Sequence, residues 1–166
     1  MSQRHLLTRF PRLPDAPSPL LASVERRVTF SDVDPMGIVW FGRYPLFIEM
    51  AAEELWSRCG LSYVRLYEVG VCAPVAKLNL DYLRPMRLGE TIQVTAAWVW
   101  DEAAKLNTEY VLTKPDGLTA AVASCVQVFA DLKSGAPLLL FPPLIQRVRE
   151  EWSAGAFSCH QQTPNA

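Results

Sequence analysis

Hydrophobic residues recur at helical spacing in one stretch of the chain, between Pro45 and Cys59. On a helical wheel, apolar residues fall on one face of this stretch and polar residues on the other. The apolar stripe consists of Ile48, Ala51, Ala52, Leu55 and Cys59, and the polar face of Glu49, Glu53 and Ser57. Pro45 suits the first helical position because its missing N–H would have no partner there, and Gly60 suits the end of the helix. One long helix is therefore predicted.

From Val71 onward hydrophobic residues recur at every second position, which is typical of half-buried strands. Lys114-Pro115-Asp116-Gly117 is typical of a hairpin turn between the last two of these strands. A shorter strand, Val24 to Phe30, is predicted ahead of the long helix, with Val28 and Phe30 on one face. The long strands are predicted over residues 76–82, 92–100, 106–112 and 118–130, and two further helices over 62–68 and 142–152.

This order of elements predicts an α+β fold, in which one antiparallel sheet wraps around the long helix and covers its apolar stripe. The length of 166 residues suits a single domain. Residues 1–22 contain four prolines and no sustained periodicity, so we expect an extended or disordered leader there. The domain is predicted over residues 23–152, and a flexible tail over 153–166.

Charge and cysteine usage argue against several classes of protein. With 16 basic and 17 acidic residues the net charge is −1, so we expect no nucleic-acid or membrane partner. No segment approaches the roughly 18 apolar residues that span a bilayer. The four cysteines lack C-x-x-C spacing and the two histidines, His5 and His160, stand near the ends, so no metal site is expected. A reduced, cytoplasmic protein without a cofactor is predicted.

The candidate chemistry lies in the turn between the first strand and the long helix. Asp32 and Asp34 stand two residues apart there, ahead of Trp40 and Phe41. Aspartates in turns commonly bind nearby backbone N–H groups, but one of these carboxylates could also be a nucleophile or general base in a partly apolar pocket. The unpaired N–H groups at the following helix start could stabilise an oxyanion. Spacing alone leaves both roles open for either aspartate.

Other polar residues are weaker candidates. Glu49 is most simply part of the solvated helix face, although one turn into the helix it could reach the site. Lys77 and Asn79 on their strand face either solvent or a dimer interface, and Lys105 stands in a turn. Trp98 and Trp100 are predicted to be core residues because of their strict alternation. A Ser-His-Asp set is excluded by the positions of the histidines, and no phosphate-binding glycine loop is present.

Ser31 to Tyr44, with its D-x-D-P-x-G-I-V-W core, closely resembles the hotdog-fold acyl-CoA thioesterases of the 4-hydroxybenzoyl-CoA thioesterase type. The resemblance continues in Phe47 to Ala51, Leu80 to Pro85 and Leu88 to Glu90, and covers about residues 24 to 150. It implies a five-stranded antiparallel sheet wrapped around one long helix. It also implies homodimers with active sites at the subunit interface, often paired into homotetramers.

The resemblance separates the two aspartates. It assigns the catalytic carboxylate to Asp34, as nucleophile or as base toward water, and leaves Asp32 to shape the turn. It places the backbone N–H that polarises the thioester carbonyl on Phe41, and Gly37 permits a close approach of backbone to substrate. The substrate-binding residues expected on this basis are Trp40, Ile38, Tyr44, Glu49, Lys77, Asn79 and Lys105.

The expected function is hydrolysis of an acyl-CoA thioester, with an aromatic or short acyl group, to free acid and CoA. Ile38 stands where many relatives carry histidine, as in the aromatic branch of the family. Lys105 is the only basic residue in the turn 101–105, so acyl carrier protein is an alternative carrier to CoA. A non-catalytic acyl-CoA or acyl-carrier-protein binding module is a further alternative. A hotdog dehydratase is disfavoured because no histidine lies near the turn.

Overall fold

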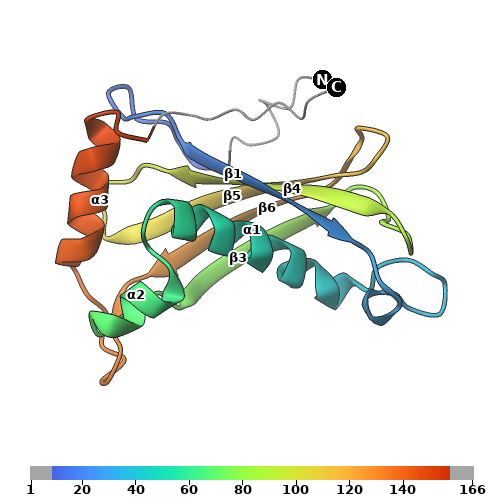
Figure 1. The fold of residues 1–166 in the computed structure, drawn as a ribbon, viewed down its shortest axis with the longest axis horizontal. Helices are drawn as coiled ribbons and strands as arrows, with labels where there is room; N and C mark the ends of the chain where they lie inside the picture. The colour runs from blue at the N-terminus through green and yellow to red at the C-terminus, as the bar shows by residue number, and fades with distance from the viewer. Residues whose placement is uncertain (1–8, 158–166) are drawn as a thin grey trace.

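A computed structural model describes residues 9–157 and contains a five-stranded antiparallel sheet with one long helix lying across it (Figure 1). The strand order is β1-β4-β5-β6-β3. The strands are β1 (Leu20–Arg27), β3 (Val75–Tyr82), β4 (Thr91–Val99), β5 (Lys105–Thr113) and β6 (Thr119–Val128). The predicted α+β fold, with an antiparallel sheet around a single long helix, is confirmed.

The long helix α1 (Tyr44–Arg58) matches its prediction to within one residue at each end. All five residues of the predicted apolar stripe are buried, and the opposite face is exposed. Ala51 is completely buried, and this small side chain lets the helix lie close to the sheet. The helix packs chiefly against β1 and β4, and its N-terminal end lies near the end of β1 (Figure 1).

The shorter elements surround this core. Helix α2 (Tyr63–Glu68) follows the cap residue Ser62, and α3 (Pro143–Ser153) lies across one end of the sheet (Figure 1). Both helices were predicted. A separate two-stranded ladder of β2 (Val71–Cys72) and β7 (Ala130–Asp131) was not predicted. Trp98 belongs to the core as expected, and it packs against Trp152 of α3 with ring centroids 4.7 Å apart.

The first strand differs from its prediction of Val24 to Phe30. It begins at Leu20, inside the predicted leader of residues 1–22, and ends at Arg27, where its pairing with β4 stops. Phe30 begins a short 3-10 helix, η2 (Phe30–Asp32), and is 84% exposed, so its expected place in the strand, on one face with Val28, is wrong. The cause is Asp32, whose carboxylate binds Thr29 and turns the chain. Residues 1–8 and 158–166 of the expected leader and tail lie outside the described residues.

Strand β3 was expected to be half-buried, and this expectation is wrong. Apart from Leu80, which is partly buried, its residues are exposed on both faces. The physical reason is that α1 covers β1 and β4, whereas β3 lies at the opposite edge of the sheet. Alternation in the sequence could not distinguish an edge strand from a central one.

Candidate active site

The loop that joins β1 to α1 is tied to the connection between β3 and β4. The Val39 N–H donates to the Met86 carbonyl at 2.9 Å, and the Leu88 N–H donates to the Gly37 carbonyl at 3.2 Å. Ile38 also forms an isolated antiparallel bridge with Arg87. These main-chain contacts hold the loop at the end of the sheet opposite α3 (Figure 1).

Asp32 is the buried anchor of this loop and is 2% exposed. One carboxylate oxygen accepts the Thr29 N–H at 2.9 Å and the Thr29 hydroxyl at 2.8 Å, and the other accepts the Arg26 guanidinium at 2.7 Å. Burial acts to raise the pKa of Asp32, but the hydrogen bonds from Thr29 and the charge of Arg26 outweigh it, so the pKa lies below its ordinary value. Asp32 is therefore held as a carboxylate with both oxygens occupied.

Asp34 has a different environment, being only partly buried. Its Oδ1 accepts the Met36 N–H at 2.8 Å, and no other hydrogen bond to the carboxylate is present among residues 9–157. Its backbone closes a tight turn, with the Asp34 N–H donating to the Ile38 carbonyl and the Gly37 N–H donating to the Asp34 carbonyl, both at 2.9 Å. Gly37 has φ +73°, a conformation that side-chain-bearing residues rarely adopt. The turn thus presents Asp34 with Oδ2 available to a ligand.

Phe41 begins the 3-10 helix η3 (Phe41–Arg43), which runs directly into α1. The first N–H groups of a helix have no partner within it, and they carry the positive end of its dipole. The Phe41 carbonyl accepts the Tyr82 hydroxyl at 3.1 Å, which ties this residue to the edge strand β3. The preceding N–H, that of Trp40, donates to the Asp32 carbonyl at 2.9 Å. Asp32 therefore connects the turn bearing Asp34 to the helix start.

The aromatic residues at the helix start depend on Gly42. A Cβ atom at Gly42 would stand 2.3 Å from the Trp40 ring, so only glycine lets the indole lie over this backbone. The rings of Trp40 and Phe41 are 4.9 Å apart, and their residues are 47% and 65% exposed. They form an apolar surface beside the Phe41 amide, where an acyl group could lie.

Tyr44 lies beneath this surface rather than on it. It is 3% exposed and packs edge-on against Tyr82, with ring centroids 4.8 Å apart. Burial raises the pKa of its phenol, so it is a neutral hydroxyl at ordinary pH. Within one chain, Tyr44 supports the helix start from the core.

The structure brings together Asp34, Gly37, Ile38, Trp40 and Phe41 on one loop, and it leaves the other expected substrate-binding residues elsewhere. Glu49 is on the exposed face of α1, and Lys77 and Asn79 are on β3. Lys105 forms an ion pair with Asp101 at 3.0 Å.

Lys105 lies far from Asp34 in the same chain. It follows the far end of β4, whereas Asp34 follows the end of β1 that pairs with the start of β4. The length of β4 therefore separates the two residues by about 25–30 Å at ordinary strand rise.

Three residues that support this loop were not identified from the sequence. Arg26 reaches Asp32 and stacks over the Phe47 ring, with 4.1 Å from the guanidinium carbon to the ring centroid. Tyr82 donates its hydroxyl to the Phe41 carbonyl, and Gly42 leaves room for the Trp40 ring. A glycine directly after two aromatic residues was a usable signal for Gly42, but the other two contacts link separate elements and leave no local signal.

Among the described residues no group of three or more histidine, cysteine, aspartate or glutamate side chains is placed to hold a metal ion. No helix within residues 9–157 is both long and apolar enough to cross a membrane.

Comparison with known proteins decides the family. Residues 28–151 match the model of the thioesterase-like superfamily, a span that includes the whole loop and the sheet beyond it. The chain belongs to the thioesterase-like superfamily. The expectation of a hotdog-fold thioesterase is thereby confirmed.

Individual proteins resemble the chain over most of its domain. The protein YneP of Bacillus subtilis (strain 168) is 29% identical over 115 residues, which cover 69% of this chain and 83% of the relative. The 1,4-dihydroxy-2-naphthoyl-CoA hydrolase of Thermosynechococcus vestitus (strain NIES-2133 / IAM M-273 / BP-1) is 25% identical over 117 residues, or 68% of this chain and 80% of the relative. The solved DHNA-CoA thioesterase of Staphylococcus aureus matches with a TM-score of 0.74 at 20% identity, covers 82% of this chain and 93% of its own, and shows the shared fold.

Proposed function

We propose that this protein hydrolyses acyl-CoA thioesters, with Asp34 as the reacting carboxylate and the Phe41 N–H as the donor to the thioester oxygen. The observation that carries the proposal is the pairing of a carboxylate with one open oxygen and a helix-start amide on a single loop. The Asp32 carbonyl, which binds the Trp40 N–H, links the two halves of that loop. A related hydrolase acts on an aromatic acyl-CoA, which supports the same substrate class here.

The chemistry needs only these two groups and water. In the base-catalysed route, Asp34 takes a proton from water as the water oxygen bonds to the thioester carbon, and the carbonyl oxygen becomes an oxyanion near the Phe41 N–H. Collapse of this intermediate breaks the C–S bond and gives the acid and the CoA thiolate, which takes up a proton. Removing one oxyanion donor typically costs about 3–4 kcal/mol of transition-state stabilisation.

In the nucleophilic route, Asp34 itself bonds to the thioester carbon and expels the thiolate. The resulting mixed anhydride is then hydrolysed by water, which regenerates the carboxylate. The environment of Asp34 is compatible with either route, because Oδ1 is held by the Met36 N–H and Oδ2 is available.

An aromatic acyl group is the preferred substrate in this proposal. Trp40 and Phe41 expose apolar rings beside the amide, and aromatic rings gain from stacking as well as from burial. Ile38 places a further apolar side chain on the same loop.

We infer that a second copy of the chain completes the site. Strand β3 is an exposed edge, and edge strands offer unpaired N–H and C=O groups to another strand. If two β3 strands paired antiparallel, the end of β3 that bears Lys77 in one copy would lie beside the end that bears Tyr82 in the other. There the Tyr82 hydroxyl donates to the Phe41 carbonyl. Lys77, Asn79 and Lys105 would then serve the site of the partner. A homodimer, or a homotetramer built from two of them, fits this arrangement.

The proposal also covers the cofactor, the cellular location and the partners of the protein. CoA enters only as part of the substrate and leaves as product, so no resident cofactor is needed. The cytoplasm, where acyl-CoA is made and used in a reducing environment, is the proposed location. No nucleic acid or membrane is proposed as a partner.

The test is turnover against binding over a panel of acyl-CoAs, from acetyl to decanoyl together with benzoyl, hydroxybenzoyl and phenylacetyl. Thiol release is followed with a thiol reagent, and binding by calorimetry with the same thioesters. The proposal predicts thiol release, fastest with the aromatic members. Saturable binding without release on any member would contradict it and favour a binding module. Thiol release from acyl thioesters of acyl carrier protein, with none from the acyl-CoAs, would show that acyl carrier protein is the carrier instead of CoA.

A further inference from the structure

The face of the sheet turned away from α1, called here the outer face, is also buried over the central strands β4, β5 and β6. In β5, Leu106, Tyr110 and Leu112 pack into the core with α1, and the residues between them point to the opposite face. Antiparallel sheets commonly leave such a face to water. Here these residues are at most 3% exposed in β5, and their neighbours in β4 and β6 are buried too. The buried part of the outer face consists of Ala97, Val99, Asn107, Glu109, Val111, Val122 and Ser124.

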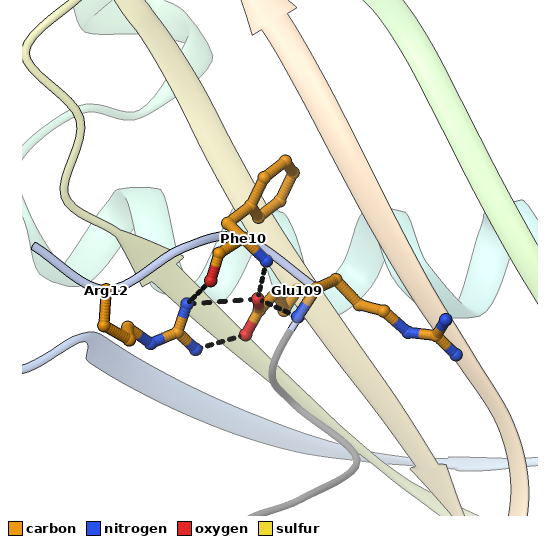
Figure 2. Close-up of polar contacts among 4 residues, drawn as sticks. Phe10, Arg12 and Glu109 are labelled. Carbon is orange, nitrogen blue, oxygen red and sulfur yellow. Dashed lines mark hydrogen bonds and ion pairs between the residues drawn. The ribbon is translucent and has the colours of Figure 1, made fainter.

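Glu109 lies in the middle of this face and is completely buried. Figure 2 shows the N-terminal segment crossing over it, with α1 behind the sheet. The N–H groups of Arg9 and Phe10 each donate to Glu109 Oε1 at 2.7 Å. The Arg12 guanidinium donates to Oε1 at 3.1 Å and to Oε2 at 2.5 Å. We call residues 9–12 the strap.

Charge complementarity makes the strap the right occupant of this face. A buried carboxylate is unfavourable unless it is paired and hydrogen-bonded, and the strap supplies two backbone donors and one bidentate guanidinium. Arg9 adds an ion pair with Asp81 on the edge strand β3. The strap therefore holds to the sheet at its centre and at its edge.

We propose that the outer face is a docking surface for the chain's own residues 9–12, and that this strap keeps a second copy of the sheet off that face. Around Glu109 on the same face lie the buried apolar side chains of Ala97, Val99, Val111 and Val122, and side chains of this kind pack one sheet on another at about 10 Å. The strap occupies the space that a second sheet would need. Self-association through this face then requires the strap to leave and the charge of Glu109 to be removed.

The test uses the full chain and two substitutions of Glu109. Glu109→Leu removes the carboxylate that accepts the Arg9 and Phe10 N–H groups and the Arg12 guanidinium, and puts an apolar side chain in its place. Glu109→Gln keeps the shape and one acceptor oxygen but turns an amide NH₂ toward Arg12. Glu54→Gln is the matched control, because Glu54 forms an exposed ion pair with Arg58 at 2.6 Å on α1. Trypsin cleavage at the Arg9–Phe10 and Arg12–Leu13 bonds reports release of the strap, and light scattering after size exclusion reports the mass.

Trypsin should cut both bonds about tenfold faster in Glu109→Leu than in the wild-type protein, because cleavage follows the population of the released strap. Glu109→Gln should show a smaller increase, and Glu54→Gln none. The particle mass of Glu109→Leu should double relative to wild type. Unchanged cleavage in both Glu109 variants would overturn the anchoring role. Faster cleavage of Glu109→Leu without any increase in mass would overturn the control of association.

Discussion

The two ends of the sheet hold their elements in different ways. At the α3 end, Trp98 packs between Trp56 and Trp152, with ring centroids 5.2 and 4.7 Å away. At the other end, the loop between β1 and α1 is held by backbone hydrogen bonds and the buried carboxylate of Asp32, while its aromatic side chains face outward. Burial of large side chains stabilises the first end. Hydrogen bonds fix the second and leave its side chains available to a substrate.

Arg149 illustrates the first mode of construction. It is 5% exposed, and its guanidinium lies over the rings of Trp100 at 3.6 Å and Phe141 at 4.0 Å. Arg26 at the opposite end also stacks on a ring, that of Phe47, but its charge is directed to Asp32. An arginine side chain thus completes the packing at one end of the sheet, and another arginine orients the loop at the other end.

The largest expected effect on stability is at the α3 end. Trp98→Ala should lower the free energy of unfolding by about 3–5 kcal/mol, because it opens a cavity in a tightly packed cluster. Trp40→Ala is the matched control, since Trp40 is 47% exposed and should cost less than about 1 kcal/mol. Denaturant titration followed by circular dichroism measures both. Equal losses for the two tryptophans would show that the two ends do not differ as described.

A smaller loss is expected for Asp32→Asn, about 2–3 kcal/mol, because the partly buried charge of Arg26 would be left without its carboxylate. Since the pKa of Asp32 is lowered in the folded protein, its charged form contributes stability above the ordinary pKa of 3.8. That contribution is lost as pH falls through the folded-state value. The stability difference between wild type and variant should therefore be full near pH 7 and shrink steadily below pH 3.8. A difference that is independent of pH would contradict the role of this charge.

Gly42→Ala should act on the site with little effect on stability. The added methyl group would push the Trp40 ring away from the helix start, and a misplacement of this size should lower kcat/KM by about tenfold. Gly60→Ala serves as a comparison, because nothing lies within 4 Å of a Cβ at that position and its φ of +71° makes it a stability variant only. Steady-state kinetics with an aromatic acyl-CoA and thermal unfolding of both variants distinguish the two effects. Unchanged kinetics in Gly42→Ala would show that the position of Trp40 does not matter.

Local patterns were sufficient for α1 and for the existence of the central strands. The apolar stripe of α1 is a property of fifteen adjacent residues, and it matched the buried face. The alternation of polar and apolar residues does not predict burial that is caused by segments distant in the sequence. Glu109 stands at a position that alternation assigns to solvent, but it is buried by Arg9 to Arg12, about one hundred residues earlier in the chain.

The two aspartates show the same limit within the site. Two residues apart in a turn, Asp32 and Asp34 were equivalent until a family resemblance separated them. The structure distinguishes their surroundings: Arg26 and Thr29 surround Asp32, while Asp34 retains an open oxygen. Neither partner of Asp32 could be assigned from spacing, because the chain must turn at η2 before they meet.

The most direct test of the proposed chemistry is the turnover of Asp34→Asn on the best aromatic acyl-CoA of the panel. Asp116→Asn is its control, since Asp116 also accepts a backbone N–H two residues ahead, that of Leu118 at 2.9 Å, in the hairpin after β5. With both variants folded as judged by circular dichroism, Asp34→Asn should lose at least about 100-fold in kcat and Asp116→Asn less than about twofold. Wild-type turnover in a folded Asp34→Asn variant would contradict the account.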